Sequence, residues 1–242
     1  MSRIEEALRK AQKNGGGGRR NARALQVVRN NNSSSRESRE VRIEHSKQIA
    51  RMAEDELLSL KALDKARIVY RDMDDSSVEN SFRNMRTRLL QKNAGESSVV
   101  MVTSVCGGSG NSFVSLNLTS AFSFDRSRTA LLIDCNLHHP AYENLLSYED
   151  NQGITDYLDR DDIGIEEIIH SVGIERLRLI PGGSQRNVPV EYFTSVKMHE
   201  LLNNVRNRYP DRFVVVDTPP VLESADSQIL AGLCDYVLLV VP

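Results

Sequence analysis

The chain has 242 residues, of which 40% are hydrophobic and 26% are charged, a composition typical of a soluble globular protein. No apolar run approaches the roughly 18 residues that span a bilayer, and the start, MSRIEEALRK, lacks the apolar core of a secretory signal. The three cysteines lack metal-ligand spacing, which together with the absent signal favours a reducing, cytoplasmic location.

The charge is unevenly distributed along the chain. Residues 1–51 carry 13 Lys and Arg against 5 Asp and Glu, although the whole chain has a net charge of only -2. Residues 1–13 have the apolar spacing of a short amphipathic helix, and 14–41, rich in Gly, Asn and Ser, predict a flexible basic linker. Such an arm could dock on a protein or on the inner face of the plasma membrane, or it could be a solvated tail. It contains no recognisable nucleic-acid module, so we expect no nucleic-acid partner.

The rest of the sequence predicts a connecting segment followed by an α/β domain. Residues 42–75 are predicted to be a helical connecting segment, and 76–242 the domain itself. Near-continuous apolar runs indicate strands buried on both faces, and they occur in SSVVMVTS, RTALLIDC, RLRLIP, RFVVVDTPP and DYVLLVVP. Helices are expected between them at 112–125, 153–159, 164–171 and 191–207. This alternation predicts a parallel β-sheet flanked by helices, with ligands at the carboxyl ends of the strands.

A glycine-rich turn follows the first predicted strand and leads into a helix. The N–H groups of such a turn, together with the N-terminus of the helix, suit a phosphate group. The alternative is a tight turn that needs glycine only for its backbone conformation. On the first interpretation, the residues that bind the phosphates of ATP or ADP are Gly107, Gly108, Ser109, Gly110, Asn111 and Ser112.

Two aspartates end neighbouring strands in this prediction. Asp134 ends the second strand and Asp217 the fourth, and both should lie beside the glycine-rich turn. Carboxylates in that position can hold a hydrated Mg²⁺, and Ser112 falls where the serine or threonine of a phosphate loop ligates the metal. We therefore predict Ser112, Asp134 and Asp217 as metal-binding residues, with the two aspartates as the catalytic pair.

The order of these motifs resembles one known family. CGGSGNS, ALLIDCNLHHP, LRLIPGGS and FVVVDTPPVLESAD, ending with DYVLLVV, resemble the bacterial tyrosine kinases of capsule and exopolysaccharide synthesis, within the deviant Walker A P-loop ATPases. The resemblance covers about residues 70–242, and DTPP with the later SAD is its most distinctive part. It implies that Mg·ATP lies on the loop, that tyrosines of a C-terminal tail are phosphorylated in trans within a ring, and that a membrane polysaccharide co-polymerase is the partner.

The sequence departs from the family pattern at several positions. Asn111 replaces the loop lysine, and no lysine occurs anywhere in 93–196. Asn136 stands where the second aspartate of the Walker A′ motif belongs. The ring-forming Glu-x-x-Arg-x-x-Arg motif keeps Arg83 and Arg86, which we expect to mediate a homo-oligomer, but it loses its glutamate. No tyrosine-rich tail precedes Pro242, so either the sequence is cut short or tail phosphorylation is absent.

Two functions remain open at this point. In the first, the chain is a nucleotide-binding regulator of polysaccharide assembly with weakened or lost kinase activity. In the second, it is an active ATP-dependent tyrosine autokinase or ATPase in which another cation replaces the lysine. Candidates for that cation are Arg83, Arg86, Arg126 or a residue of a neighbouring subunit.

Overall fold

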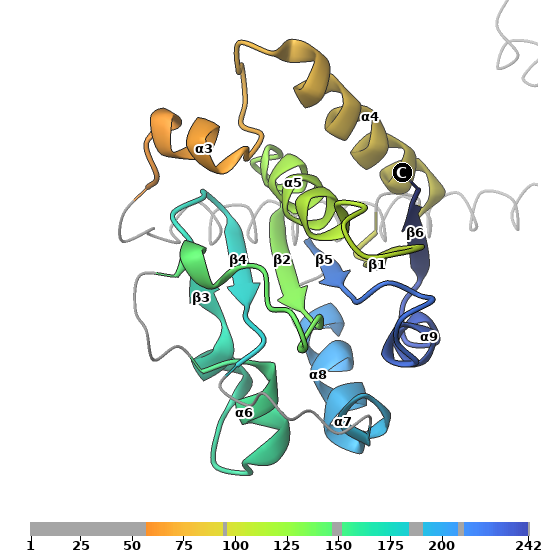
Figure 1. The fold of residues 1–242 in the computed structure, drawn as a ribbon. Helices are drawn as coiled ribbons and strands as arrows, with labels where there is room; N and C mark the ends of the chain where they lie inside the picture. The colour runs from red at the N-terminus through yellow and green to blue at the C-terminus, as the bar shows by residue number, and fades with distance from the viewer. Residues whose placement is uncertain (1–56, 94–95, 147–151, 184–190, 208–210, 242) are drawn as a thin grey trace, which may run out of the picture. The chain divides into compact units, whose positions relative to one another are not determined.

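The computed structural model of the chain describes residues 57–93, 96–146, 152–183, 191–207 and 211–241 (Figure 1). The helix expected at 1–13 and the linker expected at 14–41 lie outside the described residues, as does the first part of the connecting segment. Within the described residues, no helix is both long enough and apolar enough to cross a membrane.

A six-stranded sheet forms the centre of the domain, in the order β3-β4-β2-β5-β1-β6. All five predicted strand segments are confirmed. The strands are β1 (Val99–Ser104), β2 (Thr129–Asp134), β3 (His170–Ser171), β4 (Leu177–Ile180), β5 (Arg212–Asp217) and β6 (Tyr236–Val240). Every neighbouring pair is parallel except β3 with β4, which is antiparallel. The sheet is therefore mixed, although mostly parallel, and β3 is a short edge strand that the apolar pattern did not predict.

The helices differ in detail from the prediction. The segment expected at 112–125 is α5, and 153–159 is α6. The segment expected at 164–171 is a 3₁₀ helix followed by β3, and 191–207 is divided into α7 and α8. The helices are α3 (Leu60–Ala66), α4 (Ser76–Lys92), α5 (Asn111–Ser123), η1 (Glu143–Leu145), α6 (Ile154–Asp159), η2 (Ile165–Ile168), α7 (Glu191–Thr194), α8 (Val196–Asn207) and α9 (Asp226–Ala231). The break before α8 lies at Ser195, whose hydroxyl accepts a hydrogen bond from the N–H of Met198 at 3.1 Å, a helix-capping contact.

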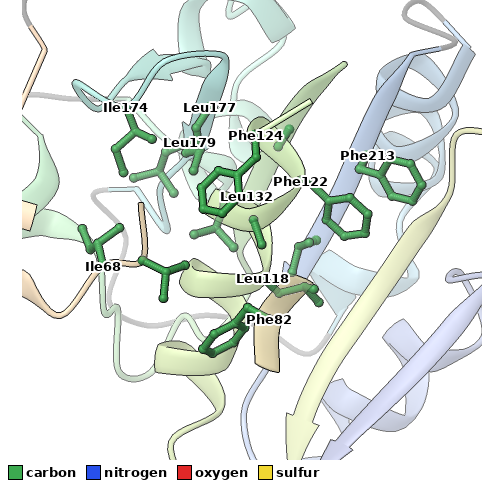
Figure 2. Close-up of a cluster of buried hydrophobic side chains, with 14 of the residues drawn as sticks. Ile68, Phe82, Leu118, Phe122, Phe124, Leu132, Ile174, Leu177, Leu179 and Phe213 are labelled. Atoms are coloured by element: carbon green, nitrogen blue, oxygen red, sulfur yellow. The ribbon is translucent and has the colours of Figure 1, made fainter. Parts of the chain in front are cut away.

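Alternate residues of the strands point to opposite faces of the sheet, and each face has its own core. In β1, Val100 and Val102 pack in the cluster beneath α4 and α5, whereas Val99 and Met101 pack in the cluster beneath α8. Figure 2 shows the first cluster, in which the rings of Phe122 and Phe213 stack with centroids 4.0 Å apart. Burial on both faces explains why the strands read as continuous apolar runs.

The topology brings the carboxyl ends of three strands together beside one helix N-terminus. β5 lies between β1 and β2, and the register places Asp134 directly opposite Asp217. Helix α5 begins immediately after the turn that follows β1, and it packs across β1, β5 and β2. This arrangement produces a single edge of the sheet on which all the predicted site residues can meet.

Candidate nucleotide-binding site

The glycine-rich turn has a conformation that requires glycine at two positions. Gly108 has φ +75° and Gly110 has φ +86°, and a side chain at either residue would be strained. No atom lies within 4 Å of where a Cβ would stand at Gly108 or Gly110, so the space in front of the turn is open. The carbonyl of Cys106 accepts hydrogen bonds from the hydroxyls of Ser104 and Ser109, at 3.0 and 2.8 Å, which hold the turn in shape.

Asn111, which the family resemblance matches to a lysine, turns inward instead of toward the open turn. It is the first residue of α5 and only 8% exposed. Its Nδ2 donates to the carbonyl of Thr218 at 2.8 Å and to Oδ1 of Asp217 at 3.3 Å. The amide therefore ties the start of α5 to the end of β5, and it brings no positive charge to the site.

Asp217 is fully buried beneath the turn and is the centre of a hydrogen-bond network. Its Oδ1 accepts from the hydroxyl of Ser115 at 2.9 Å, and its Oδ2 accepts from the hydroxyl of Tyr142 at 2.7 Å. Burial raises the pKa of Asp217, and hydrogen bonds from Ser112, Tyr142, Ser115 and Asn111 oppose that rise. Burial, and then the charge of Asp217, hold the pKa of Tyr142 well above its usual range, so this hydroxyl stays protonated and donates.

Asp134 lies beside Asp217 and is 1% exposed. Its two oxygens accept hydrogen bonds from the backbone N–H groups of Asn136 and Ala141, both at 3.0 Å. Burial, and then the negative charge of Asp217, raise the pKa of Asp134 to about 8. The two predicted catalytic carboxyls are thus adjacent, and one of them is mainly protonated at neutral pH when no cation is bound.

Two further oxygen atoms near this pair are buried without partners. Oδ1 of Asn136 and Oδ1 of Asp226 have no hydrogen-bond partner among the described residues. His138 approaches the other oxygen of Asp226 at 3.7 Å, a long distance for an ion pair. Unpaired buried oxygens have an energetic cost, and they fit a site that water or a cation would complete.

The residues present fit a phosphate-and-magnesium site in which the residue at position 111 is neutral. The open turn and the N-terminus of α5 can hold phosphate oxygens. Ser112, Asp134 and Asp217 can orient a hydrated Mg²⁺, which usually keeps several waters and takes further ligands from the phosphates. The described residues contain no group of three or more Asp, Glu, His or Cys side chains placed to hold a metal by themselves.

The arginines expected to mediate a homo-oligomer make contacts within the chain. Nε of Arg83 lies 2.7 Å from Oε1 of Glu79, and Nη1 of Arg86 donates to the carbonyl of Ala121 at 2.8 Å. Ala121 is near the C-terminal end of α5, ten residues from Asn111. At 1.5 Å per residue, this places it about 15 Å from the turn. Arg86 therefore caps the far end of α5 and is remote from the missing lysine, and Arg126 also follows that end.

Replacing Arg86 with methionine is expected to lower the free energy of unfolding by about 1–2 kcal/mol, because the Ala121 carbonyl loses a charged donor at a helix end. Urea unfolding followed by circular dichroism measures this, with the exposed Arg88→Met as the matched control. Unchanged stability together with a loss of oligomers in ultracentrifugation would instead assign Arg86 to a contact between subunits.

Three side chains of the site were not predicted from the sequence. Tyr142 and Ser115 both donate to Asp217, and the carboxylate of Glu223 accepts a 2.6 Å hydrogen bond from the N–H of Gly107. The spacing of Ser115 from Asn111 was the only available signal, since residues four apart share a helix face. Tyr142 and Glu223 reach the site through tertiary packing, which no local pattern indicated.

The chain has the features of a P-loop NTPase fold. Its sheet is mostly parallel, a glycine-rich turn joins β1 to α5, and aspartates end β2 and β5. The AAA domain family (AAA_31) matches residues 97–242. Among curated proteins, the putative tyrosine-protein kinase EpsB of Ralstonia solanacearum is 35% identical over 169 residues, and the tyrosine-protein kinase YwqD of Bacillus subtilis is 32% identical over 142 residues. The matched region is 69% of this chain but only 22% of EpsB; for YwqD it is 59% of this chain and 58% of YwqD.

Solved structures give the same assignment. The kinase domain of VpsO superposes with a TM-score of 0.59 at 31% identity, covering 69% of this chain and 81% of that domain. The kinase domain of the Escherichia coli tyrosine kinase ETK superposes with a TM-score of 0.60 at 26% identity, covering 76% and 75%. The chain therefore belongs to the AAA domain family of P-loop proteins and, within it, to the bacterial tyrosine kinases.

Proposed function

We propose that this chain is a nucleotide-binding regulator of capsular or exopolysaccharide biosynthesis whose kinase activity is weakened or lost. One observation carries the proposal. The residue in the lysine position is Asn111, and its amide is bonded to Thr218 and Asp217 beneath the turn. The turn keeps the shape for a phosphate but has no cation at that position.

The size of the loss can be estimated from electrostatics. An ammonium about 4 Å from a phosphate charge contributes on the order of 4 kcal/mol at an effective dielectric constant of ~20. Desolvation of the lysine reduces this contribution to about 2–3 kcal/mol of net binding, which corresponds to an affinity about 30- to 200-fold lower without it. ATP or ADP with Mg²⁺ would still bind, but weakly, through the turn, Ser112 and the two aspartates.

Phosphoryl transfer should suffer more than binding does. The reaction depends on positioned positive charge and on the metal, with little covalent help from the protein. The chain lacks both the lysine and, at Asn136, a carboxylate beside Asp134. Asp134 and Asp217 can still orient a hydrated metal. No side chain at the start of α5 supplies the charge that the transferred phosphoryl group needs.

The proposal places this regulator with a membrane polysaccharide co-polymerase, the partner that the family resemblance implies. The basic residues 1–51 would provide the attraction to that partner or to the anionic inner face of the plasma membrane. A homo-oligomer with Arg83 at its interface is part of the same proposal, because Arg83 keeps 39% of its side chain exposed.

An autophosphorylation assay tests the proposed loss of kinase activity. The purified chain is incubated with Mg·ATP and probed for phosphotyrosine, beside the Asp217→Asn variant as a control for the site. We expect no signal in the wild type above that of the variant. Robust labelling that disappears in Asp217→Asn would establish the alternative, an active autokinase with a cation from a neighbouring subunit.

A further inference from the structure

The carboxylate of Glu223 lies against the glycine-rich turn. Its Oε1 accepts a hydrogen bond of 2.6 Å from the backbone N–H of Gly107. A Cβ added to Gly107 would meet Oε1 at 3.2 Å and Oε2 at 3.4 Å, so both oxygens are close to the turn. A carboxylate that accepts from an N–H of a glycine-rich turn makes the kind of contact that a phosphate oxygen would make there.

The backbone that carries Glu223 is fixed to the central sheet. The N–H of Val221 donates to the carbonyl of Ser104, the last residue of β1, at 2.8 Å. Two residues earlier, the carbonyl of Pro219 accepts from the hydroxyls of Thr103 and Ser227, at 2.8 and 2.5 Å. The turn after β5 is therefore anchored to the same strand end from which the glycine-rich turn begins, which keeps Glu223 beside Gly107.

The side chain of Glu223, unlike its backbone, is able to move. The residue is exposed, and within the described residues it forms no ion pair with an arginine, lysine or histidine. A rotation about its side-chain bonds would free the N–H of Gly107 without disturbing the anchored turn. Until it rotates, its negative charge opposes the approach of another anion.

We infer that Glu223 is an internal competitor of the nucleotide phosphate, and that its carboxylate must leave Gly107 before a phosphate can bind to the turn. This inference rests on the proposed function and adds a second cause of weak binding that is independent of Asn111. Neutralising Glu223 should therefore strengthen nucleotide binding even when the residue at 111 is unchanged.

The test measures Mg·ADP binding by calorimetry, because ADP avoids turnover. Glu223→Gln keeps the shape and removes the charge, and Glu223→Ala removes the hydrogen bond as well. We expect both variants to bind Mg·ADP about 5- to 20-fold more tightly than the wild type, tenfold being about 1.4 kcal/mol. Glu96→Gln is the matched control, since Glu96 is exposed and precedes β1, at the opposite end of the strand from Gly107. It should leave the affinity unchanged.

A second measurement needs no nucleotide. In amide NMR spectra, the resonance of Gly107 should shift in Glu223→Ala and stay unchanged in Glu96→Gln.

The affinities for Mg·ADP are also compared in the Asn111→Lys background, in case the wild type binds too weakly for titration. Equal affinities with and without the Glu223 substitution would overturn the inference and leave the proposed function intact. If none of these proteins binds Mg·ADP, the proposed function is wrong and the inference is wrong with it.

Discussion

Between pH 5 and pH 8, the free energy of unfolding of the wild-type chain is expected to fall by about 3–4 kcal/mol because of Asp134. Replacing Asp134 with asparagine should abolish this fall. Burial, together with the charge of Asp217, raises the pKa of Asp134 to about 8. Asparagine resembles the protonated carboxyl in shape and in its lack of charge. Relative to the wild type, the variant should therefore gain stability steadily as the pH rises from 5 to 8.

The sign of this effect follows from proton binding. The unfolded chain releases the Asp134 proton near the usual pKa of about 4, whereas the folded chain keeps it until the pKa of about 8. Between these values the folded state binds more protons, so the free energy of unfolding falls as the pH rises, by at most about 1.4 kcal/mol per unit. The stabilising contribution is complete below pH 4 and is lost as the pH passes through 8.

Urea unfolding of both proteins at pH 5, 6, 7 and 8 measures the difference. Titrating groups remote from Asp134 contribute equally to wild type and variant, so the pH dependence of the difference reports on Asp134 together with its neighbour Asp217. Asp72→Asn serves as the control, because Asp72 is exposed and asparagine tolerates its positive φ of 61°. A difference that does not change with pH would mean that Asp134 is already ionised in the folded chain at pH 5.

Five of the six strands were predictable from the sequence, for a physical reason. A strand buried on both faces is apolar at successive positions, and β1 and β5 each contain four successive buried apolar residues, Val99–Val102 and Phe213–Val216. β3 has only two residues, His170 and Ser171, which are half-buried and follow no periodic pattern. Its pairing with β4 depends on the turn between them, which no pattern of apolar residues specifies.

The meeting of the two aspartates was predictable from the sequence, but the contacts of the candidate site were not. Parallel strands place their carboxyl ends on one edge of the sheet, which is why Asp134 and Asp217 could be expected to meet there. The family resemblance also implied that Asn111 stands where a lysine is expected. It could not show that the amide turns inward to Thr218, because that depends on how closely α5 packs against β5. The roles of Tyr142 and Glu223 are tertiary in the same way.

Asn111→Lys is expected to tighten Mg·ATP binding about 30- to 200-fold. The lysine ammonium would lie beside the phosphate and contribute about 2–3 kcal/mol to the net free energy of binding. The fold should tolerate the change. Asp217 would lose one hydrogen-bond donor but keep those of Ser115 and Tyr142. The new ammonium would also offset the negative charge of the buried Asp217.

The matched control for this substitution is Asn111→Met. Methionine resembles lysine in length but carries no charge, and it also breaks the bonds of Asn111 to Asp217 and Thr218. It therefore separates the effect of the missing charge from the effect of freeing the start of α5.

Calorimetric titration with Mg·ATP of the wild type, Asn111→Lys and Asn111→Met tests most directly whether the glycine-rich turn is a phosphate site that has lost its charge. Only the lysine variant is expected to bind Mg·ATP more tightly than the wild type, by about 30-fold or more. Equal affinity in the wild type and the lysine variant would contradict it, because another group would then already supply the cation.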